Sequence, residues 1–293
     1  MRVTESRLLD IAQAGVAKGR DRYGNAASQA SSGIRVNSAQ DDPTAWAEAM
    51  RARAASLVAE GRGKSIEHAR TSLLSTESSL TQVSDALSRA RELTLQMSNG
   101  TLTDRQRSAA AVEIRDLRES ILSALNAEGT TGEHLFGGTA DAAFDPSGAY
   151  LGDTTTRAVS VGPATVPGSS LSVSVTGDSV ATSAGGDPLF QTLDDLAAAL
   201  DANDPVAVRS ALDPLGRLID RANEVRSGVG VRISALDDAE AARSSLQTAL
   251  DNRSASLVGA DMVDAASELA RAQQVLETSR SVAQQVISSL SRA

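Results

Sequence analysis

The stretch that decides the fold is Ile66–Met97, IEHARTSLLSTESSLTQVSDALSRARELTLQM. Apolar or small residues recur in it at alternating steps of three and four, without a miss, over more than four heptads. This spacing is typical of long helices that pack along a narrow seam. It predicts one long helix whose seam consists of Ile66, Ala69, Leu73, Thr76, Leu80, Val83, Leu87, Ala90, Thr94 and Met97.

Local signals place the start of this helix well before Ile66. Asp42 followed by Pro43 is a strong helix start, because the carboxylate accepts free N–H groups and proline gives up one that has no partner. We expect the helix to run from Pro43 to about Met97 and to be looser near Gly61 and Gly63.

A second helix is predicted to fold back on the first. Asn99-Gly100 ends the first helix, and Thr103 with Gln106 then forms a capping box. The second helix should continue to about Ala127. Its predicted inward residues are Val112, Leu117, Ile121 and Leu125.

Both ends of the chain are also predicted to be helical. Residues 1–32 form a polar, alanine-rich pattern that ends where Gly33 can supply a left-handed residue. A four–three repeat runs to the other end, through Val258, Met262, Ala265, Leu269, Ala272, Leu276, Ser279, Ala283, Val286 and Leu290. Such thin seams bury little surface on their own, so the sequence predicts that the two ends pair and that the chain self-assembles or copolymerises.

The middle of the chain has a different character. Residues 129–189 are rich in Gly, Ser, Thr and Pro, and alternating runs at Arg157–Val161 and Leu171–Val175 predict short strands. Helical pattern returns at Leu189, and Asp204-Pro205 and Asp213-Pro214 offer two further helix starts. The predicted fold class is therefore mainly α: long antiparallel coiled-coil-like helices from the N- and C-terminal regions, with a small β-rich insertion between them.

Composition argues against catalysis. The chain has no cysteine, which excludes thiolate metal sites. It has only two histidines, which are too few for a histidine-rich metal site. Helix capping explains Asp42 without a metal, so no cofactor and no enzymatic activity are expected. The net charge is −9, and basic residues alternate with acids, which argues against nucleic acid as a partner.

Two further absences bear on location. No run of 18 apolar residues occurs, so no membrane insertion is expected. Asp10 interrupts the apolar residues near the start, and no cleavable signal peptide is visible. The chain is expected to be cytoplasmic, or exported by a route that uses no such signal.

Several motifs resemble the flagellin superfamily. Ser31–Asn37, SSGIRVN, followed by Asp41–Pro43, DDP, is similar to a signature near the start of these proteins. True flagellins usually continue the paired aspartates with Ala-Ala-Gly, whereas Pro43 resembles the FlgL-type hook-associated proteins. Further similar stretches are Met1–Thr4, Asn99–Asp104, Leu135–Thr139 and Ala260–Met262.

The resemblance implies a structural protein of the bacterial flagellum with three nested layers. Residues 1–40 plus 255–293 would form a terminal coiled coil that is disordered in the monomer. Residues 41–139 plus 190–254 would form a helical rod, and 140–189 a small outer β-rich domain. The implied role is that of an adaptor at the hook–filament junction, without catalysis.

The implied partners are all flagellar. They are neighbouring copies of the chain in a ring, the first hook–filament junction protein, flagellin, an export chaperone and the flagellar type III export apparatus. The implied location is extracellular, reached without a cleavable signal peptide. One alternative is a short flagellin, and a less favoured one is a cytoplasmic coiled-coil scaffold protein.

Two sets of residues are predicted to serve assembly. The signature set is Ser32, Gly33, Arg35, Asn37, Asp41, Asp42, Pro43, Leu135, Phe136, Gly137 and Gly138. The terminal-helix set places Leu269, Leu276, Val286 and Leu290 against the side of the N-terminal helix that carries Leu8 and Ile11, or against neighbouring copies.

Overall fold

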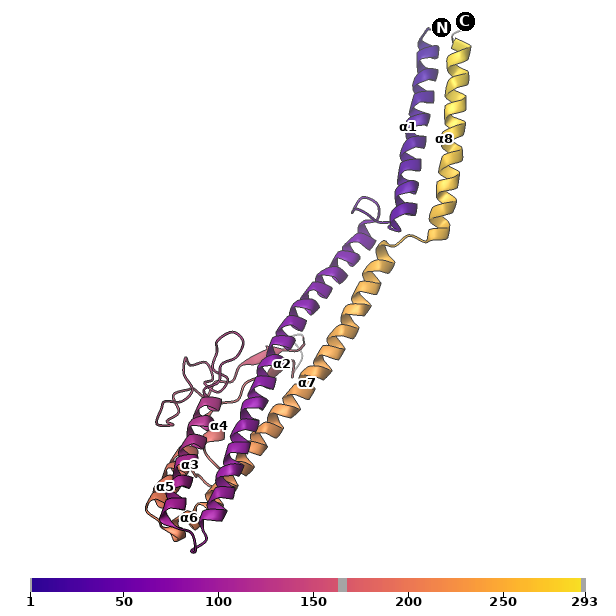
Figure 1. Cartoon of the computed structure of the whole chain (residues 1–293). Coiled ribbons are helices and arrows are strands. Elements are labelled where there is room, and N and C mark those ends of the chain that lie inside the picture. Colours follow the sequence, from indigo (N-terminus) through magenta and orange to yellow (C-terminus); the bar gives the residue numbers. More distant parts are fainter. Residues whose placement is uncertain (1, 163–167, 291–293) are drawn as a thin grey trace. The chain divides into compact units, whose positions relative to one another are not determined.

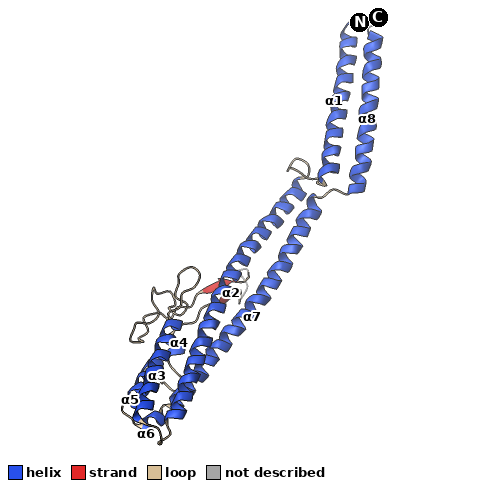
Figure 2. Cartoon of the chain, in the orientation of Figure 1, coloured by secondary structure: helices blue, strands red, loops and turns tan. Residues whose placement is uncertain are grey.

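Helices make up most of the computed structural model, which describes residues 2–162 and 168–290. A small antiparallel sheet of two strands accompanies them (Figures 1 and 2). The helices are α1 (Arg2–Ser32), α2 (Pro43–Met97), α3 (Asp104–Leu125), α4 (Asp178–Ala181), α5 (Leu189–Asp201), α6 (Pro205–Ser210), α7 (Leu212–Val258) and α8 (Met262–Leu290), and the strands are β1 (Ala158–Ser160) and β2 (Ser170–Ser172). The predicted mainly α fold with a small β insertion is confirmed.

The chain divides into two compact units. Unit 1 contains residues 1–59 and 245–293, and unit 2 contains residues 60–244. Each long helix, α2 and α7, contributes one end to each unit, and the units are described separately below.

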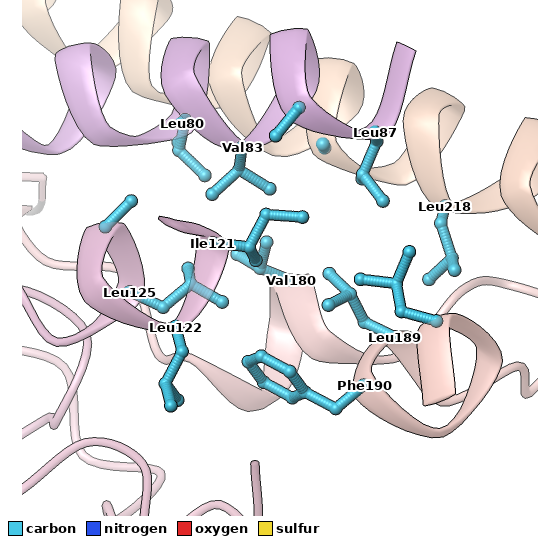
Figure 3. Close-up of a cluster of buried hydrophobic side chains, with 14 of the residues drawn as sticks. Leu80, Val83, Leu87, Ile121, Leu122, Leu125, Val180, Leu189, Phe190 and Leu218 are labelled. Atoms are coloured by element: carbon cyan, nitrogen blue, oxygen red, sulfur yellow. The ribbon is translucent and has the colours of Figure 1, made fainter. Parts of the chain in front are cut away.

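The seam of α2 forms one side of the core of unit 2. All ten predicted seam residues from Ile66 to Met97 are buried. The helix continues without a break through Gly61 and Gly63. Figure 3 shows Leu80, Val83 and Leu87 across from the buried residues of the neighbouring elements, which include Ile121, Leu122, Leu125, Val180, Leu189, Phe190 and Leu218.

The capping box predicted for α3 is present. Thr103 is the N-cap residue, and its backbone N–H donates to the Gln106 side chain at 2.9 Å. The inward placement of Val112 is wrong, since that side chain is 55% exposed. Ala111 and Ile114 are buried instead, so the inward face of α3 includes residues before and after Val112 but not Val112 itself.

Of the two further proline starts, at Asp204-Pro205 and Asp213-Pro214, the first is correct. Asp204 caps α6, where its carboxylate accepts from the amides of Val206 and Ala207 at 2.9 and 3.0 Å. The start at Asp213 is wrong, because α7 already begins at Leu212 and Asp213 lies in its first turn.

The two strands are shorter than predicted but lie within or beside the predicted runs. Ala158 pairs with Ser172, and Ser160 pairs with Ser170. Backbone bonds extend the ladder beyond the strands, from Val173 N to Arg157 O at 2.8 Å and from Val161 N to Ser169 O at 2.7 Å. The two predicted strands therefore exist and pair with each other, with their regular part reduced to three residues each.

In unit 1, α1 and α8 lie side by side (Figure 1). The four–three repeat from Val258 through Met262 does not run along one helix. α7 ends at Val258 and α8 begins at Met262, whose side chain is 57% exposed. The periodicity continues across this break, but Gly259 and Asp261 between the two helices interrupt the helical backbone.

Within residues 2–162 and 168–290, no helix combines the length and the apolar composition that crossing a lipid bilayer requires.

Candidate functional site

The first seven predicted signature residues, from Ser32 to Pro43, come together where the chain leaves α1 and enters α2. The returning pass leaves helical structure at the same level, between α7 and α8. We call residues 33–42 and 259–261 the crossover. It lies entirely within unit 1.

Gly33 ends α1 with a left-handed residue. Its φ is +69°, and its N–H donates to Gln29 O at 2.9 Å. The Ser32 hydroxyl donates to Ser28 O at 2.7 Å and accepts from the Ile34 amide at 3.2 Å. A residue with a Cβ is strained at this φ, so glycine suits the position.

Backbone hydrogen bonds tie the two passes of the crossover together. The amides of Arg35 and Val36 both donate to Val258 O, at 2.7 and 3.2 Å. The Ala260 amide donates to Gly33 O at 2.8 Å. Val36 is 1% exposed. The outgoing and returning passes are therefore held in a fixed register by main-chain atoms.

Arg35 adds a side-chain link across the same two passes. Its guanidinium donates to Leu257 O at 3.2 Å and lies 3.5 Å from the Asp42 carboxylate. Both side chains of this ion pair are partly exposed, so its net contribution to stability is small. Arg35 acts mainly by linking the start of α2 to the end of α7.

The paired aspartates have separate tasks. Asp41 Oδ2 accepts from the Asn37 and Ser38 amides at 3.0 and 2.9 Å, which closes the turn before α2. Asp42 Oδ1 accepts from the Ala45 amide at 3.0 Å and caps the helix. That backbone bond lowers the pKa of the Asp42 carboxyl below its ordinary value, and Arg35 lowers it further. Each carboxylate thus has an ordinary structural role, which needs no metal.

The returning half of the crossover was not predicted from the sequence. Asp261 Oδ1 accepts from the amides of Val263 and Asp264, at 2.8 and 3.3 Å, and starts α8. The signal was available as a glycine at 259 followed by an aspartate two residues later. The uninterrupted four–three repeat through Val258 and Met262 concealed it.

The other four signature residues lie in unit 2, in the turn Leu135–Gly138. Leu135 and Phe136 are buried, at 1% and 0% exposure. Phe136 O accepts from the Gly177 amide at 2.8 Å and from the Tyr150 hydroxyl at 3.0 Å. This turn therefore joins the end of the helical hairpin to the β insertion.

Gly138 has to be glycine for two reasons. Its φ is +69°, and a Cβ there would overlap the Asp153 side chain. That aspartate accepts from Thr139, and the hydrogen bond from the Thr139 hydroxyl is the largest cause of the lowered pKa of Asp153. Position 138 leaves no room for any larger residue.

The terminal helices pack through small residues. A Cβ on Gly19 would lie 3.3 Å from Leu276 Cα, so α1 and α8 approach closely at this point. Leu276 is buried, and Leu269 and Val286 are half-buried.

The structure addresses only part of the predicted contact between α8 and the side of α1 that carries Leu8 and Ile11. Ile11 is 64% exposed, so within one chain it is not part of the contact with α8. The face with Gly19 and Ala26 takes that place. The side chains of Leu8 and Leu290 lie outside the described part of the structure, and a contact of these residues with other copies stays a prediction.

The described residues contain no cluster of three or more His, Asp or Glu side chains that could hold a metal ion. His68 is exposed on α2, and His134 Nδ1 lies 3.2 Å from Asn126 O in a loop. What the signature residues build is a joint between helices and a buried turn.

Comparison with known proteins agrees with this geometry. The family described as the bacterial flagellin N-terminal helical region matches residues 8–141, which include both signature segments. Flagellar hook-associated protein 3 of Escherichia coli is 28% identical over 248 residues, covering 74% of each chain. The chain is similar to the FlgL-type hook-associated proteins of the flagellin superfamily.

Two further similar proteins extend the comparison. Flagellar hook-associated protein 3 of Salmonella typhimurium is 26% identical over 161 residues, which is 52% of this chain. The match spans about half, 49%, of that relative's length. A solved structure of a flagellar hook-associated protein from Vibrio parahaemolyticus has a TM-score of 0.68 and 27% identity, and covers 75% of this chain and 100% of that one.

Proposed function

We propose that the chain is the structural adaptor at the hook–filament junction, placed between the first junction protein and flagellin, without catalysis. The observation that carries the proposal is the likeness to hook-associated protein 3 over 74% of both chains. That likeness extends well beyond the N-terminal region that flagellins share. The resemblance of Pro43 to the FlgL type points the same way.

The predicted layers and residues are part of the proposal. Residues 1–40 plus 255–293 would form the inner coiled coil, 41–139 plus 190–254 the rod, and 140–189 the outer domain. The crossover would hold the two terminal helices in register while copies assemble into a ring. Exposed apolar side chains on α8 support contacts between copies, since they have no cover in the single chain: Val263, Val275, Val282 and Ile287.

Export and location follow from the same proposal. The chain would leave the cell through the flagellar type III apparatus with the help of a chaperone, and would act outside the cell. The absence of cysteine suits such a route, because a stray thiol could cross-link in an oxidising exterior.

Deletion of the gene followed by electron microscopy tests the junction role. We expect hooks without filaments and flagellin released into the medium, with filaments restored by the wild-type gene. Loss of flagellin from the cells together with its absence from the medium would instead support the short-flagellin alternative. Normal filaments in the deletion strain would contradict both.

A second measurement separates the proposal from a cytoplasmic scaffold protein. Limited proteolysis of the purified monomer should remove both ends and leave a core near residues 40–255, because the terminal helices are expected to order fully only in the assembled ring. Termini that resist the protease as well as the core does would favour the scaffold alternative.

A further inference from the structure

The turn between α2 and α3 carries an asparagine–glycine pair that the junction role leaves unexplained. Asn99 and Gly100 are both exposed. Asn99 Oδ1 accepts from the Thr101 amide at 3.2 Å and from the Thr101 hydroxyl at 3.1 Å. Nothing lies within 4 Å of the place where a Cβ on Gly100 would stand. Thr101 thus holds the side-chain oxygen of Asn99, and the next residue in the chain is a glycine with open space beside its Cα.

We infer that Asn99 is a self-modification site, at which the Gly100 nitrogen attacks the side-chain amide and converts the residue to isoaspartate or aspartate. The Gly100 nitrogen loses its proton and bonds to Asn99 Cγ. The bond from Cγ to Nδ2 breaks, and ammonia leaves with that proton. Water then opens the five-membered imide at either carbonyl, which gives isoaspartate or aspartate without any redox step.

The local geometry favours the first step. Negative charge develops on Asn99 Oδ1 as the nitrogen attacks, and the two donors of Thr101 are already directed at this oxygen. Donors placed where charge develops lower the barrier of acyl chemistry. The described residues supply no hydrogen-bond acceptor to the Gly100 amide, so it is available as the nucleophile.

Other asparagines of the same chain are held differently and provide internal controls. Asn252 lies inside α7, where the helix engages the amide of the next residue. Asn126 donates to Phe144 O at 3.1 Å and accepts from the Phe144 amide at 2.9 Å. Both are expected to stay intact while Asn99 reacts.

Conversion of Asn99 to isoaspartate would change a residue that contacts the buried Arg107 side chain. Asn99 O accepts from the Arg107 guanidinium at 2.8 Å, and Arg107 is only 3% exposed. The same guanidinium donates to Met97 O, at the end of α2, at 3.2 Å. In an isoaspartate at position 99 the main chain runs through Cβ and Cγ and is one methylene longer. The carbonyl that Arg107 contacts then becomes part of a free carboxylate, which no longer ties the main chain to Arg107. Ageing of Asn99 should therefore loosen the turn from Ser98 to Thr103.

Incubation of the folded full chain at mildly alkaline pH tests the inference. Peptide mapping with fragmentation that distinguishes isoaspartate from aspartate should find the product at Asn99, with ammonia released in equal amount. The rate at Asn99 should exceed that at Asn252 by at least about tenfold, a factor that corresponds to about 1.36 kcal/mol of barrier. Hydrogen exchange in residues 98–103 should be faster in the aged protein than in the fresh protein.

Two variants complete the test. Gly100→Ala should slow the reaction by about tenfold, because the new Cβ hinders the nitrogen, while the open space around it leaves the fold intact. Thr101→Val should also slow it, since one of the two donors to Oδ1 is lost. Reaction at Asn99 no faster than at Asn252, or an unchanged rate in Gly100→Ala, would overturn the inference. An unchanged rate in Thr101→Val would overturn the part assigned to the hydroxyl.

Discussion

At the scale of single residues, the glycines of α1 differ in what surrounds them. Gly19 faces Leu276, whereas a Cβ on Gly15 or Gly24 would have nothing within 4 Å. Glycine weakens a helix by about 1 kcal/mol relative to alanine. A glycine in a helix therefore needs a local reason, and the close approach of α8 supplies one for Gly19 alone.

Gly19→Leu should disturb the pairing of α1 with α8, because the side chain would have to displace Leu276. Gly24→Leu is the matched control, with the same gain in helix propensity and free space around it. Hydrogen exchange of α1 and α8 in the assembled protein, where these helices are expected to be fully ordered, is the measurement. Protection should fall in Gly19→Leu and hold or rise in Gly24→Leu, and equal protection in both would refute the close packing.

Asp187 gives a prediction on pH. Its carboxylate accepts from Arg217 at 2.8 and 3.0 Å and from the Ser183 hydroxyl, and these bonds, Arg217 first, lower the pKa of Asp187 well below its usual range. A lowered folded-state pKa contributes stability that is complete above the unfolded value of about 3.9 and is lost as the pH falls through the folded value.

The stability difference between the wild type and Asp187→Asn should therefore be present at neutral pH and shrink below about pH 4. Urea unfolding at a series of pH values measures it. Arg217→Gln should show a similar loss, because it removes the first partner. A difference that stays constant down to the lowest pH would contradict this account.

At the scale of elements, the α2 seam separates neighbouring leucines cleanly. Leu73 is fully buried, and Leu74, the next residue, is 41% exposed. The heptad pattern assigns these two side chains to different faces of one helix.

Leu73→Ala should lower the free energy of unfolding by about 2–5 kcal/mol, because it removes a buried side chain and leaves a cavity. Leu74→Ala, with the same change in composition, should stay within about 1 kcal/mol of the wild type. Denaturant unfolding followed by circular dichroism checks both. Equal losses in the two variants would show that the seam does not carry the core of unit 2.

Regular elements were predictable where local chemistry and periodicity agree. The seam of α2, its proline start and the capping box of α3 were all found from the sequence. The break before α8 was missed because the four–three spacing happens to continue across it. The buried guanidiniums of Arg107 and Arg118 were missed as well, since arginine is ordinarily an exposed residue and the carbonyls that they bind lie outside α3, such as those of Asn99 and Ser147.

The candidate site was predictable only in part. Ser32–Pro43 could be selected by resemblance and by its capping residues, but its partner segment lies more than two hundred residues away along the chain. Pairing at such a distance depends on the register of two long helices, which no local pattern specifies. Ile11 is exposed within one chain, where Gly19 is the residue of α1 that lies close to Leu276, and a contact of Ile11 with other copies stays a prediction.

At the scale of the whole molecule, the single chain leaves apolar side chains uncovered on α8. Val275 and Val282, seven residues apart, are 41% and 51% exposed. We expect the double substitution Val275→Asn and Val282→Asn to prevent junction assembly. The unfolding free energy of the isolated chain should change by only about 0.5 kcal/mol per site.

Filament counts by electron microscopy, beside urea unfolding of the purified protein, provide the two measurements. Ser281→Asn, on an exposed polar position of the same helix, is the control and should assemble normally. Normal filaments in the double variant would show that this face of α8 is not an interface.

The pairing of α1 with α8 also has a consequence for the order of folding. Ser32 and Met262, the ends of the two helices that are nearest along the chain, are 230 residues apart. Closing so long a loop by itself carries a large entropic cost. Contacts between α2 and α7, such as Ser56 Oγ to Asp251 at 2.8 Å, and then the crossover shorten that loop to a few residues. The terminal helices should therefore pair first next to the crossover and then progressively toward their free ends. Those free ends should be the last part of the chain to become ordered.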